Sequence, residues 1–163
     1  MKAMRPTVLH VEDDPNDVAL MKHACVAAKV SFQLLPASDG EKAIHYLEGD
    51  GIFGDRATYP MASLVFLDLN MPRKGGFEVL QWIRRNPSLK CLPVLILTSS
   101  RHEVDIKRAY ELGANSYLVK PVNFEALVNM ARVIDAYWMN LIQKPGFESA
   151  ATASRAAAEP FAG

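Results

Sequence analysis

The sequence predicts an α/β protein built around one five-stranded parallel sheet, with helices on both faces. Short, almost wholly apolar runs alternate five times with segments of helical periodicity. Strands that are apolar on both sides are typical of parallel sheets covered by helices. Four of these runs also end in polar or charged residues. Because the carboxyl ends of parallel strands meet at one edge of the sheet, we expect a ligand site there.

The first half of the chain supplies two strands and two helices. Residues 8–11 form the first strand, and Asp14 can cap a helix with Pro15 at its first position, where a missing N–H costs nothing. A second strand is expected at residues 32–35 and a short helix at 41–47. We expect His10 to be a packed, hydrogen-bonded histidine within the first strand.

The second half opens with a long loop. Residues 49–62 carry three glycines and a proline, which favours a loop. The later elements are strands at 64–67, 94–97 and 117–119 and helices at 77–85, at 103–112 and after Asn123. Gly113 is placed as a left-handed C-cap. We expect one domain over residues 5–143, followed by a flexible Ala-rich tail at 144–163.

Composition narrows the function classes. Half of the 163 residues are apolar, and 18 basic residues balance 18 acidic ones. No net field therefore favours nucleic acid or an anionic membrane, and no apolar stretch approaches the roughly 20 residues that span a bilayer. We expect neither partner. Cys25 and Cys91 and the lack of a signal-peptide pattern indicate reduced thiols in a cytoplasmic protein.

The last helix carries more apolar surface than one stripe requires. The stripe itself is Phe124, Leu127, Ala131, Ile134, Trp138 and Leu141. Tyr137 and Ile142, next to Trp138 and Leu141, extend the apolar surface past this stripe. The surface of these four residues favours a homodimer through the fourth helix, fifth strand and fifth helix. The alternative is a scattering of exposed apolar residues, which is ordinary.

The strand ends gather groups that suit phosphate chemistry. Glu12, Asp13 and Asp68 would bring three carboxylates together, and two charges ~4 Å apart repel by roughly 4 kcal/mol at an effective dielectric near 20. Hard oxygen ligands select Mg²⁺ or Mn²⁺ as the neutralising ion. Thr98 and Lys120 add a hydroxyl and an amine at the same edge. Together these groups could hold a phosphoryl group transferred to a carboxylate.

In this order and at these positions, the motifs resemble the receiver domain of two-component response regulators over about residues 5–143. The shared motifs are Val11-Glu12-Asp13-Asp14, Asp68-Leu69-Asn70-Met71-Pro72 with Gly76, Leu97-Thr98-Ser99 and Lys120-Pro121. The resemblance implies a flavodoxin-like sheet with strand order 2-1-3-4-5. It also implies a phosphorylation switch or relay rather than an enzyme acting on other substrates.

The resemblance assigns roles to individual residues. Asp68 would be the phosphoacceptor, Asp13 a direct metal ligand, Glu12 a ligand through metal-bound water, and Asn70 a ligand through its backbone carbonyl. Thr98 and Lys120 would contact the phosphoryl oxygens, and Thr98 and Tyr117 would form the switch. Asn70 and Ser100 match positions that tune dephosphorylation. The Lys120–Pro121 bond is expected to be cis, as is typical of the family.

Partners follow from the same resemblance. No effector domain follows the fifth helix, so we expect a stand-alone receiver phosphorylated by a histidine kinase, for which the phytochrome type is a candidate. A phosphohydrolase of the haloacid-dehalogenase kind would need a second Asp where this chain has Asn70. A phosphate-independent binding module on a receiver fold remains the alternative.

Overall fold

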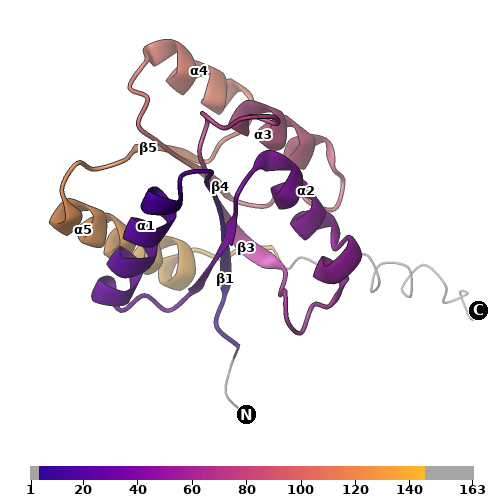
Figure 1. Cartoon of the computed structure of the whole chain (residues 1–163), viewed down its shortest axis with the longest axis horizontal. Helices are drawn as coiled ribbons and strands as arrows, with labels where there is room; N and C mark the ends of the chain where they lie inside the picture. The colour runs from indigo at the N-terminus through magenta and orange to yellow at the C-terminus, as the bar shows by residue number, and fades with distance from the viewer. Residues whose placement is uncertain (1–3, 146–163) are drawn as a thin grey trace, which may run out of the picture.

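The computed structural model describes residues 4–145 and confirms the predicted architecture (Figure 1). Five parallel strands form one sheet in the order β2-β1-β3-β4-β5. The strands are β1 (Thr7–Val11), β2 (Gln33–Ala37), β3 (Ala62–Leu67), β4 (Val94–Thr98) and β5 (Ser116–Val119). The α-helices are α1 (Pro15–Ala28), α2 (Gly40–Glu48), α3 (Gly76–Arg85), α4 (Glu103–Glu111) and α5 (Phe124–Ile134).

Helices cover both faces of the sheet because successive strand residues point to opposite sides. On β1, Leu9 and Val11 join a buried cluster with side chains of α2, α3 and α4. Val8 belongs to a second cluster, which contains buried side chains of α1 and α5. Figure 1 shows α1 and α5 side by side on one face. The carboxyl ends of β1, β3 and β4 thus open onto a single edge.

The capping residues predicted from the sequence lie at the ends of three helices. The Asp14 carboxylate accepts a hydrogen bond from the Asn16 N–H at 2.8 Å, and Pro15 is the first residue of α1. Asn123 caps α5 by accepting from the Ala126 N–H at 2.7 Å. Gly113 follows α4 with a φ of +98°, a conformation that favours glycine.

Two segments differ from the prediction. The long loop contains a 3₁₀ turn, η1 (Gly51–Gly54), and the rings of Tyr46, Phe53 and Tyr59 pack together beside it. β2 begins one residue later than expected and runs on to Ala37. It includes Pro36, which an edge strand tolerates because an outward N–H is not needed.

The predicted apolar stripe of the last helix is only partly right. Leu127, Ala131 and Ile134 are buried, but Phe124 and Leu141 are exposed. The α-helix ends at Ile134 and continues as a π-helix, η2 (Asp135–Leu141). Bonds from residue i to i+5, such as Ile142 N–H to the Tyr137 carbonyl, place more residues in each turn. Leu141 therefore rotates out of the stripe.

The expected cis bond before Pro121 is wrong. All peptide bonds of the described residues are trans, the isomer that an X–Pro bond favours by about 0.5–1 kcal/mol. Lys120 reaches its carboxylate partners from the trans form.

Within residues 4–145, no helix is long and apolar enough to cross a membrane. The predicted tail lies outside the described residues from Gly146 onward.

Candidate functional site

Three carboxylates meet at the carboxyl edge of β1 and β3. One ligand oxygen from each of Glu12, Asp13 and Asp68 lies within 4.8 Å of the others. The sheet ladder positions two of them, because the Glu12 N–H donates to the Ala37 carbonyl and the Asp68 N–H to the Val11 carbonyl, each at 3.0 Å. Glu12 is 1% exposed and Asp68 7%, whereas Asp13 faces solvent. The prediction of an acidic cluster at this edge is confirmed.

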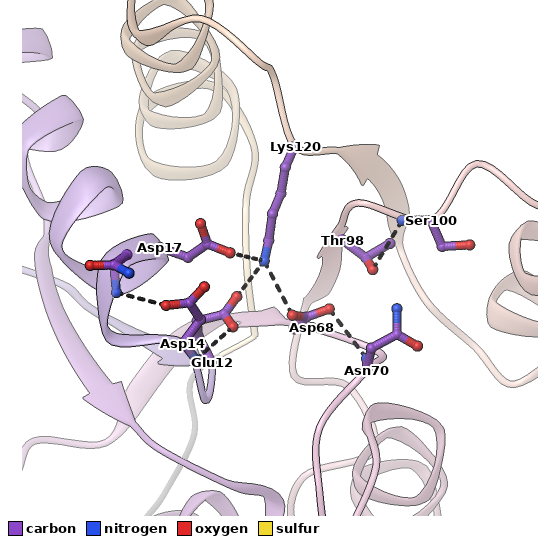
Figure 2. Close-up of polar contacts among 9 residues, drawn as sticks. Glu12, Asp14, Asp17, Asp68, Asn70, Thr98, Ser100 and Lys120 are labelled. Carbon is purple, nitrogen blue, oxygen red and sulfur yellow. Dashed lines mark hydrogen bonds and ion pairs between the residues drawn. The ribbon is translucent and has the colours of Figure 1, made fainter.

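Lys120 joins the cluster from the end of β5. Its N–H donates to the Thr98 carbonyl at 2.8 Å, which fixes the backbone beside β4. Its Nζ donates to Glu12 Oε2 at 2.5 Å, to Asp17 Oδ2 at 2.8 Å and to Asp68 Oδ2 at 3.1 Å (Figure 2). One ammonium therefore contacts three carboxylates.

Burial and the hydrogen bonds of the Lys120 ammonium shift the pKa values of the site. Burial raises the pKa of Glu12 to about 7, and the hydrogen bond from Lys120 opposes that rise. Burial alone would lower the pKa of Lys120, but its hydrogen bonds to Asp17 and Glu12 raise it above the usual range. Lys120 is thus held as a cation. The acids still outnumber it, so the edge carries an excess of negative charge that favours a divalent ion.

Asp68 is also held by the loop that follows it. Its Oδ1 accepts a hydrogen bond from the Asn70 N–H at 3.3 Å, so Asn70 lies beside the carboxylate while its side chain faces solvent. Gly76 begins α3 directly against this loop, because its N–H donates to the Leu69 carbonyl at 3.2 Å. A Cβ at Gly76 would lie 2.1 Å from the Asp68 carbonyl oxygen. The close approach requires glycine at this position.

Thr98 and Tyr117 are connected through Ser100. The buried Thr98 hydroxyl oxygen accepts from the Ser100 N–H at 3.4 Å. The half-buried Tyr117 hydroxyl donates to the Ser100 carbonyl at 3.0 Å, and the Ser100 hydroxyl donates to Asp105 of α4 at 2.6 Å. Figure 2 shows Thr98 and Ser100 on the side of Asp68 away from Asp17. A chain of contacts therefore leads from the site to α4.

The donor set fits a hard divalent cation. Carboxylate oxygens with no His or Cys ligand in the group are typical of Mg²⁺ and Mn²⁺ sites. In Figure 2 the Lys120 amine lies between Asp17 and Asp68, and Thr98 lies on the other side of Asp68. An oxyanion on Asp68 could thus be contacted by a cation, an amine and a hydroxyl.

A family model for the response regulator receiver domain matches residues 8–132 of the chain. The chain belongs to this family. Response regulator Rcp1 of Synechocystis sp. is 36% identical over 138 residues, which are 85% of this chain and 92% of Rcp1.

Solved receivers share the fold. A structure of Mn²⁺-bound Rcp1 matches with a TM-score of 0.76 and 35% identity over 86% of this chain and 99% of that one. Response regulator RPA3017, in red light signaling of R. palustris, gives a TM-score of 0.82 and 37% identity over 86% and 99%. The phosphorylated cyanobacterial phytochrome response regulator RcpA gives 0.79 and 32% over 88% and 100%.

Asp17 is the site residue of this receiver that sequence reasoning missed. It lies in the first turn of α1 and is 35% exposed. Four residues after Asp13, at a helix start next to the strand end, it could have been suspected. A first-turn acid has an ordinary explanation in the helix dipole, and the sequence alone offers no reason to look further.

His10 of the receiver packs as predicted but lacks the predicted hydrogen bond. It is 1% exposed and stacks edge-on against Phe66, and its Nδ1 has no partner among the described residues. Burial, followed by the charge of Lys120, lowers the pKa of His10 to about 4. It is therefore a neutral core residue behind the site.

The residues expected at a dimer interface divide into two groups. Tyr137 is 49% exposed and Leu141 72%. Trp138 packs against the core cluster between the sheet and α1 and α5, and Ile142 is half-buried. Of these four residues, Tyr137 and Leu141 are thus the two whose side chains are open to a partner.

Proposed function

We propose that this receiver accepts a phosphoryl group on Asp68 from the phosphohistidine of a histidine kinase, with Mg²⁺ or Mn²⁺ as cofactor. The observation that carries the proposal is the contact of one carboxylate, Asp68, with Lys120 within a cluster of three acids, of which Glu12 and Asp68 are buried. In the transfer, an O–P bond to Asp68 forms while the P–N bond to the histidine breaks, and the imidazole keeps the electron pair.

Each residue has a role in this proposal. Asp13 and Asp68 would bind the metal directly, Asn70 through its backbone carbonyl and Glu12 through a bound water. The ion would supply positive charge to the phosphoryl oxygens. Lys120 donates to another of these oxygens, and its charged state suits that role. Thr98 donates its hydroxyl to the oxygen nearest β4.

The switch is proposed to use the contacts of Thr98. When its hydroxyl turns to the phosphoryl group, the bond from the Ser100 N–H is disturbed. Tyr117 donates to the same residue's carbonyl and would change rotamer with it. Asn70 and Ser100 flank the group and would set its hydrolysis. The signal would then reach α4 through Asp105.

The proposed partners are a kinase and a second copy of the chain. RcpA and RPA3017 are a phytochrome response regulator and a red-light-signalling regulator, which supports a phytochrome-type kinase. The exposed Tyr137 and Leu141 support a homodimer through α4, β5 and α5. Two free cysteines are consistent with the reducing cytoplasm, where we place the exchange.

Intact-mass spectrometry tests the proposal. The protein is incubated with acetyl phosphate and Mg²⁺, and a gain of one phosphoryl group is expected. The gain should disappear in Asp68→Asn and when the metal is chelated. Glu41→Gln is the control, because it removes an exposed acid in the first turn of α2 that lies outside the carboxylate cluster. A wild type without the mass gain would indicate a phosphate-independent binding module instead.

A further inference from the structure

We propose that Asp17 is a positioning residue that holds the Lys120 ammonium over Asp68 when a metal occupies the acidic cluster. The inference rests on the proposed function and adds a residue to its machinery. Lys120 Nζ donates to Asp17 Oδ2 at 2.8 Å, a shorter contact than the 3.1 Å to Asp68 Oδ2. Figure 2 shows the two acids on opposite sides of this amine.

The three contacts of Lys120 match its capacity to donate. An ammonium has three N–H donors and no acceptor, and Glu12, Asp17 and Asp68 take one each. Two of these carboxylates belong to the cluster that could hold a metal, and Asp17 does not. A cation bound there competes with Lys120 for the oxygens of Glu12 and Asp68. Asp17 is the partner that remains.

Packing alone does not fix the lysine. A cavity of about 50 Å³ borders Lys120 and Asp17 and is lined by apolar side chains that include Leu20, Met21 and Leu97. A lysine stem has several rotatable bonds, and ordering such a side chain costs conformational entropy. Without a fixed anion, the stem has room to fold into this cavity and away from the phosphoryl position.

The start of α1 fixes Asp17 relative to Glu12. Glu12 Oε1 accepts from the Asp14 N–H at 3.1 Å, and the Asp14 carboxylate caps the helix by accepting from the Asn16 N–H. The turn from β1 into α1 is therefore tied at two points, and Asp17 follows in the first helical turn. The helix dipole explains an acid there, but it does not explain an ion pair with a strand-end lysine.

The rate constant of phosphorylation by acetyl phosphate, measured at saturating Mg²⁺, tests the inference. Asp17→Asn keeps the shape and removes the charge, and we expect a fall of about tenfold, because misplacing a reacting group by 1 Å can cost more. Asp17→Glu should recover part of the rate. Glu41→Gln is the matched control, since it removes an acid from the first turn of α2 without touching Lys120, and it should leave the rate unchanged.

The outcomes separate the two proposals. A wild type that gains no phosphoryl group contradicts the proposed function itself. If the wild type is phosphorylated and Asp17→Asn matches its rate, Asp17 does not position Lys120 and only this inference is overturned. A loss that vanishes as Mg²⁺ is raised assigns Asp17 to metal affinity and overturns it as well. An Asp17→Glu protein no faster than Asp17→Asn also overturns it, because the charge would then not be what places the lysine.

Discussion

The acidic side chains at the site lie close enough together to lower the stability of the metal-free protein. Glu12 and Asp68 are almost fully buried, and Asp13 and Asp17 stand near them with one lysine to offset four carboxylates. Like charges this close repel unless a cation or protons neutralise them. The metal-free protein should therefore tolerate the loss of an acid, whereas the metal-bound protein should not.

Asp13→Asn tests this balance. Raising Mg²⁺ to 100 times its dissociation constant should stabilise the wild type by about 2.7 kcal/mol and raise its melting temperature. In Asp13→Asn the increase should be largely lost, while the metal-free protein is as stable as the wild type or more stable. Asp14→Asn is the control, because Asn also caps helices well. An Mg²⁺ response in Asp13→Asn equal to that of the wild type would remove Asp13 from the metal site.

At the scale of elements, the entry to α3 fixes the backbone that carries Asp68. Gly76 lies so close that a Cβ would meet the Asp68 carbonyl oxygen at 2.1 Å and the Leu69 Cα at 2.8 Å. Both atoms belong to the backbone and cannot rotate away. The neighbouring Gly75 has a φ of −72°, and a Cβ there would meet only the Leu69 carbonyl oxygen at 3.7 Å.

The two glycines form a matched pair for mutation. Gly76→Ala should lower the free energy of unfolding by about 1–3 kcal/mol, because the helix must move away from β3, and it should slow phosphorylation of Asp68. Gly75→Ala should cost less than about 1 kcal/mol, mainly through a poorer N-cap. Urea unfolding measures the loss of stability in each variant. Equal losses in the two variants would contradict the close approach.

The positions of the helices and strands explain which site residues could be predicted from the sequence. The acidic pair, Asp68, Thr98 and Lys120 were found because strand ends in a parallel sheet share an edge. Asp17 was missed because the apolar residues of α1 are spread around the helix, with Leu20 and Val26 exposed, so periodicity does not fix its orientation. The cis and trans forms of an X–Pro bond such as Lys120–Pro121 differ by less than about 1 kcal/mol, so the sequence does not decide between them. The π-helical end of α5 follows no local sequence signal that we recognise.

At the scale of the molecule, the proposed phosphate site and the proposed dimer surface lie in different parts of the fold. The site occupies the carboxyl edge of β1 and β3, whereas Tyr137 and Leu141 project from η2, beyond α5. Tyr117 on β5 and Asp105 on α4 are both in contact with Ser100. The contacts of the proposed switch thus reach two of the three elements of the proposed dimer surface.

The oligomeric state tests that surface. Sedimentation should show a dimer for the wild type and a monomer for Tyr137→Ser with Leu141→Glu, because charge is then placed on the apolar contact. Trp138 is unsuitable for mutation because it is partly buried and packs against the core. Ile52→Glu is the control, as Ile52 is 68% exposed in η1. A dimer that survives the double substitution would place the interface elsewhere.

The phosphoryl group proposed on Asp68 can be located chemically. Borohydride reduces an acyl phosphate to an alcohol, so a phosphorylated aspartate is converted to homoserine. After incubation with acetyl phosphate and Mg²⁺, reduction and peptide mass spectrometry should find homoserine at position 68 and aspartate at positions 13, 14 and 17. Homoserine at one of those three positions, or at none of the four in a protein that has gained phosphate, would contradict the account.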